Sequence, residues 1–212
     1  TMVDLDGQHK VWIYNVIDEK TRYLLASRIA LSRTTHDAEM VMKEAQRRAG
    51  KTPKQVLTDA NRSYDDGVEI VFGAETEHVK TRPFTGGANT QRIERYHGTY
   101  KDRVKVMRAF RDVETLIQFN DGWLVYYNYF KPHQALNNKT PAEEAGIKYD
   151  VKNWSDLMRV PVSKETEVKS HIETKQIIPK TKVSLDKAFR RHRQPRISPP
   201  MPSITPKVGK LA

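Results

Sequence analysis

The sequence predicts an α/β protein in which a mixed sheet, opened by three antiparallel strands, is flanked by helices. Two neighbouring runs rich in β-branched and aromatic residues, at 10–17 and 22–31, predict an antiparallel hairpin. The strand-like stretch "TMVDLDG" precedes this hairpin, so three strands come before the first helix. Shorter strands then alternate with helices, which is typical of α/β folds.

The two strands of the hairpin flank the polar stretch "DEKTR", which is able to turn the chain back. Asp18 opens this stretch. Because short acidic side chains commonly bond to the backbone of turns, we interpret Asp18 as a turn residue rather than as a metal ligand.

The first helix is predicted by apolar residues that recur every three or four positions, namely Ala38, Val41, Met42, Ala45 and Ala49. Thr34 or Thr35 is available as N-cap, with Asp37 in the first turn, and Gly50 is a typical C-terminal stop. Beyond the helix, "QVLTD" predicts a short buried strand that ends at Asp59. The stretches "YDDGVEIVFG" and "EHVKTR" then predict a short helix and another short strand.

From about residue 90 the sequence is predicted to be helical. The buried stripe of the first long helix comprises Ile93, Tyr96, Tyr100, Val104 and Met107. The neighbouring stripe comprises Glu94, His97, Lys101, Lys105 and Arg108, so Glu94 shares its face with cations. A second helix is expected at 113–130, and in "TPAEEAGI" Thr140 and Glu143 predict a capping box.

Composition points to a polyanionic partner, because the 212 residues carry a formal net charge of +11 and a pI near 9.7. The absence of cysteine excludes disulfides and thiolate metal sites. No apolar run approaches the ~20 residues that span a bilayer, so we expect no membrane segment and a cytoplasmic location.

The composition changes near residue 160. The last 53 residues hold seven of the eleven prolines, and twelve Lys and Arg against four Asp and Glu. We therefore expect a folded domain over residues 1–147 and a basic, Pro-rich extension over 148–212 that is partly disordered. Within the extension, "VSKETEVKSHIETKQII" is compatible with one or two strands.

Two acids are placed where they are able to share a metal ion. Asp59 ends a predicted strand, Glu94 lies early on a helix between Arg92 and Arg95, and 34 residues separate the two acids. Mg²⁺ is usually held by one or two carboxylates with water and phosphate oxygens. Two such ions, roughly 3.5–4 Å apart, support phosphodiester chemistry, and a third carboxylate is usually needed to bridge them. The plain alternative for Glu94 is a solvated helix face.

Four stretches in order resemble the DDE transposases and retroviral-type integrases, and are most similar to insertion-sequence transposases of bacteria and archaea. They are "GQHKVWIYNVIDEKTRYLLA", "VLTDANRSY", "RIERYHGTYKDRVKVMR" and "WLVYYNYFKPHQALNNKTPAEEAGI". The resemblance implies that residues 1–147 form an RNase H-like catalytic core. It also implies DNA transposition and integration with two Mg²⁺ (or Mn²⁺) ions, on transposon ends and target DNA, by a homodimer or higher assembly.

In this family the acid of the "TD" strand end and the acid of the "IER" helix are catalytic metal ligands, which correspond to Asp59 and Glu94. The family's first acid would lie two positions before Thr1, so we expect a fragment whose catalytic triad is incomplete. Asp4 and Asp6 are the alternatives, although the alignment makes them a strand residue and a turn residue. The chain reads "NTQRIE" where the family tends to have an Asn pair, which leaves the DNA contacts of that loop open.

The cations around Glu94 are expected to hold DNA phosphates, and the candidates are Arg95, His97, Lys101 and Arg103. Lys101 resembles the lysine that contacts terminal DNA in integrases, with a solvated Lys as the alternative. His97 fits a phosphate contact, a role beside the metal, or a structural hydrogen bond. Packing is assigned to the aromatic positions that match the family: Trp123, Tyr127 and His133.

Two further functions stay open at this point. One is an inactive transposase relic that binds DNA through its basic surfaces. The other is a different RNase H-like nuclease, which shares the metal chemistry but does not account for the "YYNYFKPHQAL" and "TPAE" segments.

Overall fold

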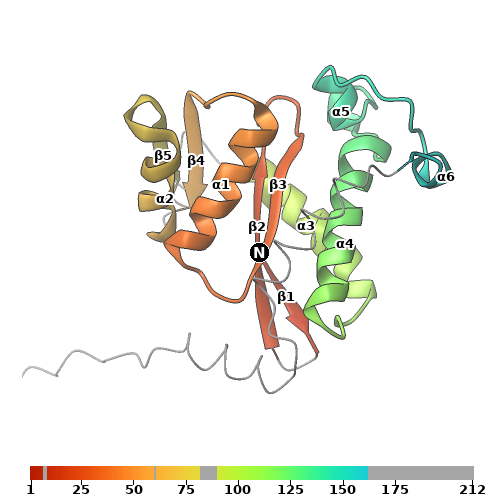
Figure 1. Cartoon of the computed structure of the whole chain (residues 1–212), viewed down its shortest axis with the longest axis horizontal. Helices are drawn as coiled ribbons and strands as arrows, with labels where there is room; N and C mark the ends of the chain where they lie inside the picture. The colour runs from red at the N-terminus through yellow and green to blue at the C-terminus, as the bar shows by residue number, and fades with distance from the viewer. Residues whose placement is uncertain (7–8, 60, 82–89, 162–212) are drawn as a thin grey trace, which may run out of the picture. The chain divides into compact units, whose positions relative to one another are not determined.

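The computed structural model describes residues 1–6, 9–59, 61–81 and 90–161 (Figure 1). The chain divides into two units, Thr1–Ile178 and Pro179–Ala212, and every described residue belongs to the first. The strands considered at 162–178 and the expected disorder of the tail lie outside the described residues. The boundary at residue 147 stays a prediction.

Three strands at the start of the chain form an antiparallel sheet in the order β1-β2-β3, as predicted (Figure 1). They are β1 (Met2–Leu5), β2 (His9–Ile17) and β3 (Leu24–Ala30). The turn between β2 and β3 is closed by Asp18, whose carboxylate accepts hydrogen bonds from the backbone N–H and the hydroxyl of Thr21 at 2.8 and 2.7 Å. The interpretation of Asp18 as a turn residue is therefore confirmed.

Two shorter strands, β4 (Gln55–Asp59) and β5 (Glu77–Thr81), pair in parallel and form a second sheet. The crossover between them consists of α2 (Ser63–Phe72) and the 3₁₀ turn η1 (Gly73–Glu75). The β-structure is thus mixed, with antiparallel pairing first and parallel pairing afterwards, as expected for this fold class.

Helix α1 (Thr35–Ala49) begins at Thr34, which forms a capping box with Asp37, and ends at Gly50 with φ +66°. It covers one face of the first sheet, and α2 packs beside it (Figure 1). The core at this contact combines residues from β2, β3 and both helices: Tyr14, Ala26, Ala30, Ala38, Val41, Met42, Ala45, Val68 and Phe72.

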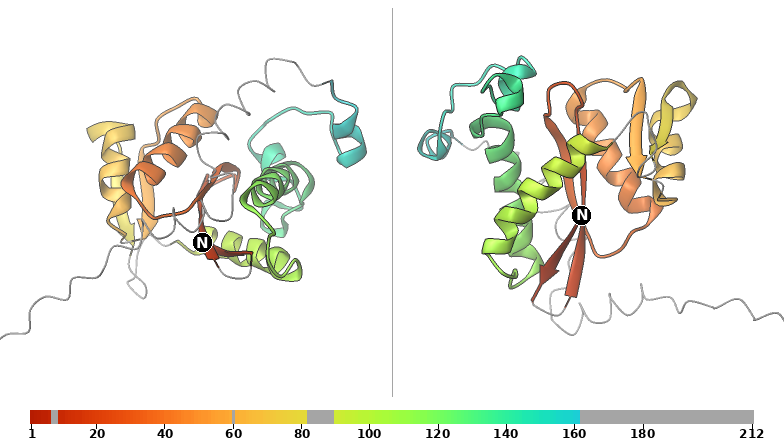
Figure 2. Two further views of the ribbon diagram at one scale, coloured as in Figure 1. Left: turned by 60° about the horizontal axis from the view of Figure 1, so that its bottom comes forward. Right: turned by 180° about the vertical axis from the view of Figure 1, so that it is seen from behind.

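Helix α3 (Gln91–Val106) lies on the opposite face of the sheet (Figure 2). Tyr96, Tyr100 and Val104 of the predicted stripe are buried, but Met107 is 43% exposed, so its predicted burial is wrong. The helix ends at Val106, and the chain then turns through a left-handed residue at position 108, which removes Met107 from the helical stripe. Phe110 is buried instead and bridges to Leu5 of β1.

Helix α4 (Val113–Val125) continues into a π-helical segment, η2 (Tyr126–Phe130), where the sequence predicted a single helix over 113–130. Two buried amides attach this segment to β3. Asn120 accepts a hydrogen bond from the Ser27 hydroxyl at 2.9 Å, and Asn128 bonds both backbone groups of Leu24. Because β3 is an edge strand among the described residues, these amides bond backbone groups that would otherwise be unpaired.

Three short helical elements complete the described chain: η3 (Gln134–Leu136), α5 (Pro141–Glu144) and α6 (Trp154–Met158). The predicted capping box of α5 is present, with Thr140 and Glu143 bonded reciprocally. Trp123 and Tyr127 are buried, and the His133 ring meets the Tyr127 ring edge to face at 4.8 Å. The assignment of these aromatic positions to packing is confirmed.

Candidate active site

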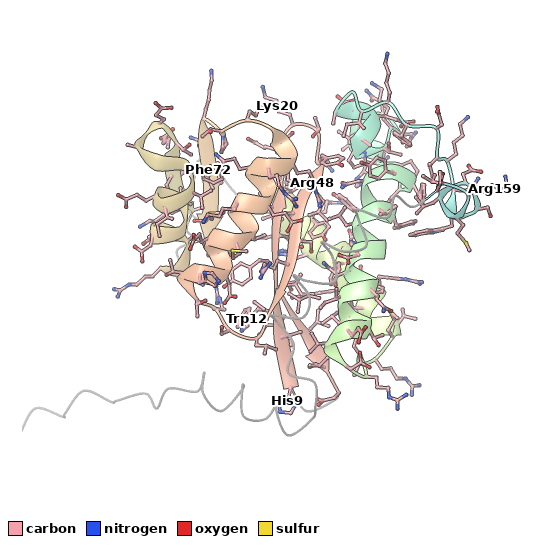
Figure 3. The ribbon with its side chains drawn as sticks, in the orientation of Figure 1. His9, Trp12, Lys20, Arg48, Phe72 and Arg159 are labelled. Atoms are coloured by element: carbon pink, nitrogen blue, oxygen red, sulfur yellow. The ribbon has the colours of Figure 1, made fainter. Side chains whose placement is uncertain are left out.

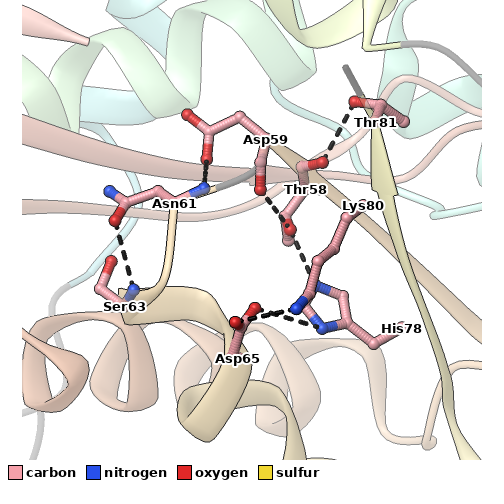
Figure 4. A network of polar contacts seen from close by, with 8 residues as sticks. All are labelled: Thr58, Asp59, Asn61, Ser63, Asp65, His78, Lys80 and Thr81. Carbon is pink, nitrogen blue, oxygen red and sulfur yellow. Dashed lines mark hydrogen bonds and ion pairs between the residues drawn. The ribbon is translucent and has the colours of Figure 1, made fainter. Parts of the chain in front are cut away.

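The carboxylate of Asp59 stands at the C-terminal end of β4, where the chain turns into α2 (Figure 4). Its side chain is 61% exposed, and its Oδ1 accepts the backbone N–H of Asn61 at 3.2 Å. The Asn61 side chain in turn accepts the N–H of Ser63 at the start of α2. Two successive side-chain turns therefore hold the carboxylate at the strand end, open to solvent.

A polar network behind Asp59 joins β4, β5 and α2 (Figure 4). The Thr58 hydroxyl lies 2.7 Å from Nε2 of His78 and 2.9 Å from the backbone oxygen of Asp59. Asp65 of α2 receives a hydrogen bond from Lys80 at 2.8 Å and faces Nδ1 of His78 at 3.9 Å. This network holds the end of β4 against β5 and α2, which limits the positions that Asp59 can adopt.

Glu94 lies in the first turn of α3, exposed to solvent, and accepts a hydrogen bond from the Thr90 hydroxyl at 3.0 Å. The same helix end is attached to the hairpin turn, because Arg92 bonds both the backbone and the side chain of Glu19. Further along α3, Tyr96 reaches Asn15 of β2 at 3.4 Å. These contacts hold the predicted "IER" helix against the face of the sheet that α1 leaves open.

The amino group of Thr1 lies at the start of β1. It donates to the backbone oxygen of Ile13 at 2.8 Å, where β1 begins beside β2. Burial, followed by the charges of Lys101 and Arg33, lowers the pKa of this group to about 6, and Asp59 acts in the opposite direction. Direct contacts thus join the start of β1 to β2 at Ile13, and the segment before α1 to the end of β4 through Arg33 and Asp59.

Of the predicted phosphate contacts, Arg95, Lys101 and Arg103 are exposed on α3. His97 is half-buried; burial, then the Thr1 amino group and then Lys101, lower its pKa to about 3. His97 is consequently neutral near pH 7, so it is able to offer a hydrogen bond but not a full charge. Its Nε2 is buried without a hydrogen-bond partner among the described residues.

The alternatives for the first acid are placed as the alignment indicated. Asp4 is a strand residue that is exposed, 3.8 Å from Lys10. Asp6 has a positive φ of 52° and contacts His9 at 3.1 Å, so it is a turn residue. Both have basic neighbours of their own in the β1–β2 hairpin.

Asp59 and Glu94 fit Mg²⁺ or Mn²⁺ by donor type and by exposure, because both present carboxylate oxygens to solvent. Within the described ranges, however, no three His, Cys, Asp or Glu residues gather into a group that could hold a metal ion. The structure thus offers two candidate ligands on two elements, and it does not itself supply a third.

Arg33 was not identified from the sequence, although it is the side chain in ionic contact with Asp59, with its Nη2 3.7 Å from Oδ2. Its guanidinium carbon also lies 4.4 Å from the centre of the Trp12 ring. In the sequence Arg33 is simply the residue before a helix N-cap, and no periodic pattern connects it with positions 12 and 59. Only the tertiary structure brings these three residues together.

Comparisons with known proteins concern the family and the fold of the chain. A family model described as a DDE domain matches residues 1–133. The structure is similar to a chain of the simian T-cell lymphotropic virus intasome in complex with the PP2A regulatory subunit B56 gamma, solved by cryo-EM, with a TM-score of 0.53 and 14% identity. The match covers 77% of this chain and 58% of that chain, so this chain spans less than two thirds of it. At this identity the likeness concerns the fold, and it confirms the predicted integrase-type α/β fold. No curated protein matches the chain.

None of the helices in the described part of the chain combines the length and apolar character needed to cross a membrane.

Proposed function

Because the chain belongs to the DDE domain family, we propose that it is the catalytic domain of a transposase. The proposed reaction is the cleavage of DNA phosphodiester bonds at the ends of a mobile element, followed by the joining of those ends to target DNA. The observation that carries the proposal is the placement of Asp59 at the end of β4, with its carboxylate 61% exposed, within the residues that the family model matches.

Asp59 and Glu94 are the proposed metal ligands and catalytic residues. Mg²⁺ or Mn²⁺, when bound, activates the attacking oxygen and stabilises the leaving oxygen of the phosphodiester. The Asn61 N–H fixes Oδ1 of Asp59, whereas Oδ2 has only the 3.7 Å ionic contact with Arg33. The Thr90 hydroxyl similarly orients Glu94 from the preceding turn.

The basic residues of α3 are proposed to bind the DNA backbone. They are Arg95, Lys101 and Arg103, which are exposed along this helix. His97 is proposed to act as a neutral hydrogen-bonding group beside them, because its pKa of about 3 leaves it uncharged. We further propose that the active assembly on DNA is a dimer or larger, since two element ends are joined.

The register of β1 defines where a third acid would complete the site. Met2 pairs with Trp12 and Val3 with Val11, so two residues added ahead of Thr1 in the same strand would lie opposite Tyr14 and Asn15. Side chains alternate along a strand, and the residue opposite Asn15 would share the face of Val3, towards α3. An acid at this position is therefore proposed to lie beside Asp59 and Glu94.

The test is a nicking assay on supercoiled plasmid with Mg²⁺ or Mn²⁺, applied to the 212-residue chain and to a variant with Asp-Glu added before Thr1. We expect robust nicking only from the extended variant. Asp59→Asn and Glu94→Gln in this background should reduce nicking to the level without protein. Asp102→Asn, at an exposed acid of α3, is the matched control and should retain activity.

Other results of the nicking assay would assign the first metal ligand to a different acid or refute the site. Nicking by the 212-residue chain that is lost on Asp4→Asn or Asp6→Asn would assign the first ligand to the hairpin. Activity that persists in both Asp59→Asn and Glu94→Gln would refute the proposed site.

The second candidate function is a DNA-binding relic without catalysis. The observation that favours it is the lack, among the described residues, of a group of three ligands able to hold a metal. It predicts salt-dependent DNA binding together with no nicking by any variant, the extended one included.

A further inference from the structure

Arg33 lies at the proposed metal site, in contact with one of its ligands, yet no part of the proposed function uses it. We propose that Arg33 is an exchangeable partner of Asp59: it neutralises the carboxylate when no divalent cation is bound, and binds a DNA phosphate when a cation takes the carboxylate. This inference rests on the proposed function, which makes Asp59 a metal ligand. It adds a DNA contact from the segment before α1 to those proposed for α3.

The contact between Arg33 and Asp59 is weak enough to be exchanged. The Nη2 to Oδ2 distance of 3.7 Å exceeds the usual hydrogen-bond range of about 2.7–3.2 Å. The two side chains are 35% and 61% exposed, and ion pairs with such exposure add little stability. A divalent cation at Asp59 brings twice the charge of a guanidinium, so it would displace Arg33 from the carboxylate.

Trp12 keeps the guanidinium at the site after such a displacement. The Arg33 Cζ lies 4.4 Å from the centre of the Trp12 ring, within the range of a cation–π contact. Trp12 itself packs against the core between β2 and α1, so its ring is a fixed platform. Figure 3 shows Trp12 at the end of the sheet near which α1 begins. Arg33 is therefore held by a contact that does not involve Asp59.

The charges also favour phosphate binding by Arg33 once a divalent cation occupies Asp59. When a cation with two charges occupies Asp59, the +1 charge of Arg33 is left without its partner, and a phosphate oxygen beside the cation restores the balance. A guanidinium matches phosphate with its planar fork of donors. Its contacts with Asp59 and Trp12 place this charge between the end of β4 and β2.

The first experiment measures Mn²⁺ binding by electron paramagnetic resonance. Arg33→Gln should bind Mn²⁺ roughly two- to fivefold more tightly than the wild type, because a competing cation of ion-pair strength is removed. Arg33→Lys should remain near the wild-type affinity, since the competing charge is kept. Arg47→Gln removes an exposed charge in the last turn of α1, roughly 20 Å along the helix, and should change nothing.

The second experiment measures the salt dependence of binding to a fluorescein-labelled DNA duplex without metal. Asp59→Asn mimics the cation by removing the carboxylate charge, and it should steepen the slope of log affinity against log salt by about 0.9, the value of one added phosphate contact. In an Arg33→Gln background the same change should leave the slope unaltered. With Asp59 intact, Arg33→Gln alone should have little effect, because Arg33 is already paired.

The outcomes distinguish a failure of the exchange between Arg33 and Asp59 from a failure of the proposed function. Mn²⁺ binding that is lost in Asp59→Asn but unchanged or weakened in Arg33→Gln overturns the inference alone. It is also overturned if Asp59→Asn alters the slope equally in both backgrounds. If the chain extended by Asp-Glu before Thr1 also binds no Mn²⁺, the proposed function is overturned and the inference with it. If Arg33 had only a structural role, Arg33→Gln would lower both the thermal stability and the Mn²⁺ affinity. The inference predicts the opposite change, an increase in Mn²⁺ affinity.

Discussion

Asn128 offers a direct test of how the π-helical segment is attached to the sheet. Its Oδ1 accepts the backbone N–H of Leu24 at 2.8 Å, and its Nδ2 donates to the backbone oxygen of Leu24 at 3.0 Å. Asn128 is fully buried, and Leu24 lies in β3, which has no neighbouring strand on this side among the described residues. The amide therefore takes the place of a neighbouring strand for one residue.

Asn128→Ala should leave both backbone groups of Leu24 buried and unpaired. Each such group costs about 1–3 kcal/mol, and entry of a water molecule would recover part of the loss, so we expect a destabilisation of about 2–4 kcal/mol. For a protein of this size that corresponds to a fall in Tm of roughly 5–15 °C. Asn128→Asp should destabilise the protein at least as much as Asn128→Ala, because it replaces the amide donor with a buried oxygen that faces the Leu24 carbonyl.

Chemical and thermal unfolding followed by circular dichroism measures this difference. Gln118→Ala, which removes an exposed amide from the same helix, is the matched control and should change stability by no more than about 0.5 kcal/mol. If Asn128→Ala destabilises no more than the control, the two hydrogen bonds do not contribute as argued, and the attachment of η2 to β3 depends on aromatic packing instead.

Three further predictions follow from the structure and the sequence. The unfolded chain protonates His97 near its ordinary pKa of 6.5, whereas in the folded protein this pKa is about 3, so stability is full above pH 6.5 and is lost as the pH falls towards 3. The loss is on the order of 5 kcal/mol at most, and His97→Gln should flatten the pH dependence of urea unfolding. Gly67→Leu should destabilise by about 1–3 kcal/mol, because a Cβ at Gly67 would already lie 3.2 Å from the Ala38 Cβ. Gly98→Ala, in open space on α3, should instead stabilise by about 0.5–1 kcal/mol, and equal effects of the two changes in thermal melts would contradict this packing. Removal of residues 162–212 should weaken binding to duplex DNA and reduce its salt dependence, since each neutralised phosphate adds about 0.9 to the slope; an unchanged slope in titrations at several salt concentrations would argue against a role of the tail in phosphate binding.

The sequence by itself determined the elements whose signals are local. The Thr34 capping box and Gly50 set the ends of α1, and the cap at Thr140 set the start of α5, because each signal depends on residues within four positions of one another. The hairpin around Asp18 and the positions of Asp59 and Glu94 at an element end were predictable for the same reason.

Only the tertiary structure decided the features that depend on residues far apart in the chain. The exposure of Met107 follows from where α3 ends and where the chain then turns, which the spacing of apolar residues does not reveal. In the sequence, Asn128 is an ordinary polar residue of a predicted helix. Its role depends on Leu24, 104 positions away, whose backbone it bonds. The pairing of Arg33 with Asp59 likewise requires the loop before α1 to meet the end of β4. Such contacts are invisible in a single sequence, because chain folding brings distant residues together without leaving a periodic pattern at either position.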